Sequence, residues 1–124
     1  MIELITSITI NLQTQTLTAY TGDRAIHQMA ISSGKPSTPT PIGNFWIAGR
    51  YPRTDLTGDD YKINLPWVMC FNGEGVTPDN YCIHPDPTDG PLGTPLSRGC
   101  IRTSTADARW LFENTQFGTP IFIF

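Results

Sequence analysis

The segment of the chain best suited to covalent chemistry is SRGCIRT, in which a single cysteine, Cys100, follows a glycine and has an arginine two positions away on either side. Gly99 permits unusual dihedral angles and close approach of the backbone, so a turn here can direct successive N–H groups at one point. Positive charge from Arg98 and Arg102 favours the thiolate, which is the reactive form of a cysteine. The segment therefore predicts a nucleophile beside an oxyanion hole.

A histidine upstream offers a base for this nucleophile. His84 ends the strand-like run YCIH, so it can lie beside Cys100 and exchange protons with it. Two less specific interpretations compete with catalysis. A cysteine at the start of a strand is often a small buried hydrophobic residue, and a histidine at a strand end is often a turn residue bonded to the backbone.

The remaining cysteines leave further alternatives open. Cys70 and Cys82, together with His84 and Cys100, are residue types that bind zinc, but their spacing matches no ordinary zinc site. Papain-like chemistry fits poorly, because there the cysteine precedes the histidine in the chain. Cys70 and Cys82 flank a predicted turn and could face each other across a hairpin. Buried unpaired thiols are common, so we favour two unbridged cysteines, no metal and no cofactor.

Length and composition restrict the class of protein. The chain has 124 residues, 39% hydrophobic and 15% charged, which fits one compact domain over residues 1–124. A net charge of -3 without a basic cluster argues against nucleic-acid binding. No apolar run approaches the roughly 20 residues that span a bilayer, and the first residues lack the pattern of a secretory signal. We expect a soluble monomer without a transmembrane segment.

Alternating apolar residues predict that strands dominate the elements around the candidate site. Residues 104–113 alone have helical spacing, with Ser104 and Asp107 as a capping pair, which predicts a helix over about 105–114. We expect a mainly β fold, a sandwich or partly closed barrel of mixed sheets with this one short helix. The predicted strands are a hairpin over 8–20 and runs at 25–32, 44–48, 66–71, 80–84 and 120–124, with a stiff loop at 34–43 and a polar excursion at 50–64.

The segment IHPDPTDGPLGTPLSRGCIRT resembles the signature of the L,D-transpeptidase catalytic domain, in which a histidine strand, a glycine-containing loop and a Ser-basic-Gly-Cys-Ile-Arg stretch follow in this order. The likeness covers nearly the whole chain. ITINLQTQTLTAY is similar to the family's first hairpin, SSGKPSTPTPIGNFWI to its Thr-Pro-x-Gly-x-Phe segment, and PWVMCF to the strand before the histidine. The resemblance implies a cofactor-free bacterial enzyme of the cell envelope or periplasm that cross-links peptidoglycan and reacts covalently with carbapenems.

The resemblance also implies a role for each residue of the site. Cys100 would attack the third residue of a peptidoglycan stem tetrapeptide, expel the terminal D-alanine and form a thioester. His84 would be the base, and would later deprotonate the acceptor amine of another stem. The backbone N–H groups of Arg98, Gly99 and Cys100 would form the oxyanion hole. Ser97 would support that turn.

Three further residues need separate expectations. Arg102 would brace the loop or bind a substrate carboxylate, and a purely structural ion pair is an equal alternative. Pro85 stands where the family usually has glycine, but proline keeps the carbonyl that orients the imidazole. Arg98 replaces a histidine found in many members, which changes local charge more than mechanism. His27 matches no catalytic position and is expected to be structural.

Two other functions remain compatible with the same residues. Water in place of the acceptor amine would give an L,D-carboxypeptidase or a peptidoglycan-targeting toxin. An inactive module that only binds wall peptides is a third possibility, against which the intact Cys100 and His84 argue. The choice between transfer and hydrolysis depends on the shape of the cleft and on the exclusion of water, so the sequence does not separate the two activities.

Overall fold

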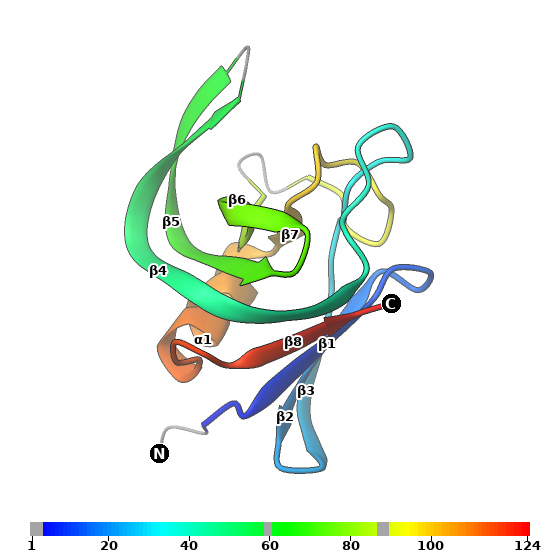
Figure 1. Cartoon of the computed structure of the whole chain (residues 1–124), viewed down its shortest axis with the longest axis vertical. Helices are drawn as coiled ribbons and strands as arrows, with labels where there is room; N and C mark the ends of the chain where they lie inside the picture. The colour runs from blue at the N-terminus through cyan, green and yellow to red at the C-terminus, as the bar shows by residue number, and fades with distance from the viewer. Residues whose placement is uncertain (1–3, 59–60, 87–89) are drawn as a thin grey trace.

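A computed structural model describes residues 4–58, 61–86 and 90–124, and within these ranges the chain forms eight strands and one helix (Figure 1). The strands belong to one mixed sheet in the order β3-β2-β1-β8-β4-β5-β6-β7. Their bounds are β1 (Ser7–Asn11), β2 (Thr16–Thr21), β3 (Arg24–Ala30), β4 (Gly43–Gly58), β5 (Tyr61–Gly73), β6 (Val76–Pro85), β7 (Ile101–Thr103) and β8 (Pro120–Ile123), and the helix is α1 (Thr105–Asn114).

The first hairpin and the last strand follow the predictions. In β1, Ile8 and Ile10 are buried and alternate with partly exposed residues, and β1 pairs with β2 in an antiparallel register. The C-terminal β8 lies between β1 and β4, parallel to the first and antiparallel to the second. It is therefore a central strand, and its buried Ile121 and Ile123 belong to the main core.

The prediction of a polar excursion at 50–64 is wrong. β4 and β5 continue through this region as a long antiparallel arm that projects from the body of the sheet at the top of Figure 1. Polar cross-strand contacts hold part of the arm: Asn64 accepts from the Arg53 guanidinium at 2.6 Å and donates to Asp55 at 2.9 Å. Such pairs stabilise a hairpin without the apolar alternation that identifies a half-buried strand in a sequence.

Helix α1 has the predicted bounds and cap. The Ser104 hydroxyl accepts a hydrogen bond from the Asp107 N–H at 3.1 Å, and the helix buries Ala108 and Leu111. A mainly β fold with mixed pairing and one short helix is thus confirmed, and its eight strands form a single sheet that is not closed. No helix in the described ranges is long and apolar enough to cross a membrane.

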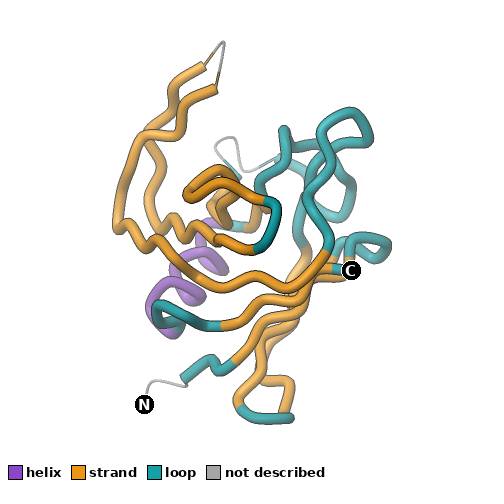
Figure 2. The backbone as a smooth tube through the Cα atoms, in the orientation of Figure 1, coloured by secondary structure: helices purple, strands orange, loops and turns teal. Residues whose placement is uncertain are grey.

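The two edges of the sheet are brought together by the segment that follows β3. Ser32 exchanges two backbone hydrogen bonds of 2.9 Å with Arg102 of the opposite edge strand β7, and Gly34 forms a bridge to Ser97. The loops after β3 and before β7 consequently run side by side, as the teal segments at the upper right of Figure 2 show. The turn that carries Cys100 lies at this junction.

Candidate active site

The Cys100 turn has a backbone that requires glycine. Gly99 has a φ of +130°, a region that residues with a side chain rarely adopt. A Cβ added at Gly99 would also lie 2.9 Å from the Tyr81 ring, closer than real Cβ atoms approach other atoms. The glycine predicted for a tight turn is therefore needed for both its dihedral angle and its lack of a side chain.

Ser97 forms hydrogen bonds within the Cys100 turn and to the loop after β3. Its buried hydroxyl accepts from the Gly99 N–H at 3.1 Å and donates to the Cys100 carbonyl, and its own N–H donates to the Ser33 carbonyl at 3.0 Å. The Gly99 N–H, expected in the oxyanion hole, is thus already engaged inside the turn. No acceptor among the described residues is bonded to the Cys100 N–H.

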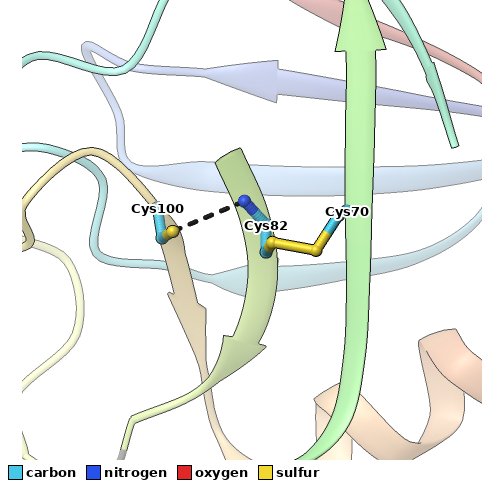
Figure 3. Close-up of a disulfide and its surroundings, with 3 residues drawn as sticks. All are labelled: Cys70, Cys82 and Cys100. Atoms are coloured by element: carbon cyan, nitrogen blue, oxygen red, sulfur yellow. Dashed lines mark hydrogen bonds between the residues drawn. A yellow bond between two sulfur atoms is a disulfide. The ribbon is translucent and has the colours of Figure 1, made fainter. Parts of the chain in front are cut away.

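The Cys100 sulfur lies beside a disulfide. Its Sγ accepts from the Cys82 N–H at 3.4 Å, and Cys82 is itself bonded to Cys70, which faces it in the β5–β6 register (Figure 3). The preference for unbridged cysteines was wrong, because the hairpin register sets the two side chains directly opposite each other. Cys100 is the one free cysteine.

The disulfide takes two of the four ligands from the zinc alternative. Cys70 and Cys82 have no thiolate to offer a metal, and the described ranges contain no group of three or more histidine, cysteine and acidic side chains arranged to hold an ion.

His84 lies near the end of β6 with a fixed ring orientation. Its side chain is buried, and its Nδ1 donates to the Pro85 carbonyl at 2.7 Å. A carbonyl only accepts, so this bond selects the tautomer with the proton on Nδ1 and leaves Nε2 as a base. Side chains alternate along a strand, so His84 faces the same side as Cys82, whose N–H contacts the Cys100 sulfur. The hydrogen bond expected of Pro85 is present.

Burial governs the ionisation of both groups. It lowers the pKa of His84 below its usual value, a shift that the Pro85 hydrogen bond and the Asp86 carboxylate oppose and the Arg102 charge reinforces. It raises the pKa of the Cys100 thiol above its usual value, outweighing the Cys82 N–H and Arg102, which lower it. Arg102 favours the thiolate, as expected, but burial outweighs it, so the shifts of the two pKa values favour a neutral thiol and a neutral imidazole in the free protein.

Alkylation of Cys100 tests this resting state. Iodoacetamide reacts with the thiolate, so the labelling rate should fall as pH decreases through a pKa that lies above that of an ordinary cysteine. Labelling rates measured from pH 6 to 10 should give a midpoint higher than that of glutathione treated in parallel. A midpoint at or below the glutathione value would show that a thiolate is already stabilised in the free protein.

Arg102 is placed by an ion pair. Its guanidinium lies 3.7 Å from a carboxylate oxygen of Asp86, whose side chain is 5% exposed. Arg102 is also the cationic side chain that acts on both His84 and Cys100. The structural ion pair considered from the sequence is present, and Asp86, which sequence reasoning did not single out, is its partner.

Outside this region, the second histidine has the structural surroundings expected of it. His27 Nε2 lies 3.2 Å from an Asp107 carboxylate oxygen on α1, and its ring lies against Trp110 at a centroid distance of 4.8 Å. These contacts attach the edge strand β3 to the start of the helix.

Comparisons with known proteins show the family of this chain and agree with its fold. Residues 5–123 match the YkuD family, described as the L,D-transpeptidase catalytic domain. The YkuD protein of Bacillus licheniformis is 30% identical over 116 residues, which cover 94% of this chain and 64% of the relative.

Two solved structures are similar in fold. A cysteine-to-serine mutant of the Enterococcus faecium L,D-transpeptidase has a TM-score of 0.85 at 26% identity, with 98% of this chain and 50% of that chain covered. The L,D-transpeptidase LdtMt1 in complex with imipenem has a TM-score of 0.82 at 25% identity, with 94% and 57% covered. The chain thus spans between half and two thirds of the length of these three proteins.

Proposed function

Since this chain belongs to the L,D-transpeptidase catalytic domain family, we propose that it is a cysteine acyltransferase acting on the stem peptides of peptidoglycan. The observation that carries the proposal is the arrangement around Cys100. A free thiol follows a glycine turn, its own N–H has no acceptor in the described part of the chain, and a buried histidine with a fixed tautomer lies on the adjacent strand.

In the acylation step, Nε2 of His84 takes the thiol proton as the Cys100 sulfur attacks the carbonyl of the third stem residue. The N–H of Cys100 donates to the oxygen that becomes negative, a contribution worth about 3 kcal/mol for one well-placed donor. The C–N bond to the terminal D-alanine then breaks, and the His84 imidazolium returns its proton to the departing amine. The product is a thioester on Cys100.

In the second step, an amine from another stem attacks the thioester carbonyl. His84, neutral again, takes a proton from that amine, and the thiol leaves with a proton returned through the same imidazole. The low pKa of His84 fits this role, because the ring is in its basic form when each attack begins. The hydrogen bond to Pro85 keeps the proton on Nδ1 and leaves Nε2 free to act as the base.

Positive charge near the nucleophile suits a substrate that carries carboxylates. Arg98 is exposed beside Cys100, and Arg102 keeps 27% of its side chain exposed while paired to Asp86. We assign Arg102 to the electrostatics of His84 and Cys100 first, and to a substrate carboxylate second. The planar guanidinium can meet Asp86 on one edge and a second carboxylate on another.

The disulfide supports an extracytoplasmic location. Disulfides persist in oxidising compartments such as the bacterial periplasm and the cell surface, and are rare in the cytosol. A Cys70–Cys82 bridge therefore fits a protein that meets peptidoglycan in the cell envelope. A neighbouring structure contains imipenem, so we also propose covalent reaction of Cys100 with carbapenems.

Product analysis with purified muropeptides tests the function. Tetrapeptide donors should give free D-alanine and cross-linked dimers, with Cys100→Ala as the blank. Tripeptides without dimers would replace transfer by hydrolysis, the carboxypeptidase or toxin activity. Unchanged tetrapeptides, together with no mass increase after incubation with a carbapenem, would leave only a wall-binding module.

A further inference from the structure

The peptide between Gly99 and Cys100 has an anchor that lies far away in the sequence. The hydroxyl of Thr40 donates to the Gly99 carbonyl at 2.7 Å and accepts from the Gly34 N–H at 2.9 Å. Thr40 is only 3% exposed, so water does not compete freely for these two hydrogen bonds. A hydroxyl has one proton, and because Gly34 supplies its own, that proton is directed to the Gly99 oxygen.

This contact sets the direction of the Cys100 N–H. The Gly99 carbonyl and the Cys100 N–H belong to the same trans peptide, in which the two groups point in opposite directions. A carbonyl held at Thr40 therefore aims the N–H away from Thr40. The other peptides of the turn have separate anchors, since Ser97 Oγ bonds the Gly99 N–H and the Cys100 carbonyl.

Glycine makes such an anchor necessary. Gly99 reaches its φ of +130° because it lacks a side chain, and the same freedom lets the peptide that follows it rotate. The Tyr81 ring packs against one side of Gly99 but fixes no carbonyl direction. An oxyanion donor is effective only when its orientation is set before the charge develops.

We infer that Thr40 is a positioning residue for catalysis, whose hydroxyl holds the Gly99 carbonyl so that the Cys100 N–H is oriented for the oxyanion. This role rests on the proposed function, because it presupposes attack of Cys100 on a carbonyl. Thr40 itself touches neither the sulfur nor the substrate. Its hydroxyl acts only through the peptide that it holds.

Two reactions of the same thiol separate this role from a merely structural one. Acylation by imipenem creates a negative oxygen on the attacked carbonyl and needs the Cys100 N–H, whereas alkylation by iodoacetamide displaces iodide and forms no oxyanion. Thr40→Val keeps the shape of the side chain and removes the hydroxyl, so it should slow acylation about ten- to a hundredfold, less than loss of a whole donor. Alkylation at the same pH should stay within about twofold of wild type, and Thr40→Ser should restore acylation.

A matched control removes a similar hydroxyl elsewhere. Thr119 is also buried, and its hydroxyl donates to the Gln116 carbonyl at 2.8 Å in the turn between α1 and β8. Thr119→Val should leave both reactions unchanged. Rates are followed by mass spectrometry below each variant's melting temperature, and Thr40→Ala supplies the measurement if Thr40→Val does not fold.

The outcomes distinguish the two proposals. Acylation of Thr40→Val or Thr40→Ala at the wild-type rate, or equal losses of acylation and alkylation, would overturn the positioning role while leaving the acyltransferase intact. A wild-type protein that alkylates but forms no imipenem adduct would overturn the carbapenem chemistry, and the role of Thr40 with it.

Discussion

Replacing Cys100 by alanine is expected to remove both turnover of tetrapeptides and the mass increase with imipenem. The sulfur forms the bond that holds the acyl group, so no intermediate can form without it, and loss of such a nucleophile typically costs about 10⁴-fold or more in rate. Liquid chromatography of muropeptides and mass spectrometry of the intact protein measure the two effects. The melting temperature should change little, because Cys100 takes no part in the disulfide and alanine removes only its sulfur atom.

The other two cysteines provide the control. In a Cys70→Ala/Cys82→Ala double variant the disulfide is absent and no odd thiol is left beside Cys100. A bridge that closes a loop of this length contributes about 3 kcal/mol, so assays should be run well below the lowered melting temperature. Retained adduct formation is the expected result. Activity that survives in Cys100→Ala, or disappears in the folded double variant, would transfer the nucleophilic role away from Cys100.

Features that depend on neighbouring residues were predictable from the sequence. The helix cap is an example, because Ser104 and Asp107 are three residues apart and their contact follows from helix geometry alone. The Pro85 contact was implied by the resemblance to the family, and its accepting carbonyl belongs to the residue that follows His84. The resemblance of the Cys100 segment to its family supplied the pairing of nucleophile and base, which spacing alone left undecided.

Features that depend on register or on distant contacts were not predictable. The Cys70–Cys82 bridge requires knowledge of which residues face each other across β5 and β6, and a one-residue slip would have separated the side chains. The resting thiol of Cys100 depends on how much burial outweighs the charge of Arg102, which sequence does not state. The hydroxyl of Thr40 meets a carbonyl 59 residues away, and nothing in its own segment marks it for that contact.

The second large effect is expected when His84, the proposed base for Cys100, is replaced. His84→Ala should lower kcat/KM for tetrapeptides about a hundred- to ten-thousand-fold, the usual contribution of a general acid and base. Wild-type activity should be lost as pH falls through the lowered pKa of His84, below the ordinary histidine value, because protonation removes the base.

The chain supplies its own control for this change, since His27 is the only other histidine and its Nε2 contacts Asp107 on the helix. His27→Ala makes the same substitution on β3 and should keep both the rate and the acid limb of the pH profile, with at most a small loss of stability from the exposed contact. Kinetics of the three proteins from pH 4 to 8 decide the assignment. Wild-type kinetics in His84→Ala, or an acid limb that persists in it, would show that another group takes the proton from Cys100. The expected result, an acid limb that disappears only in His84→Ala, would instead place that proton on the ring whose tautomer Pro85 selects.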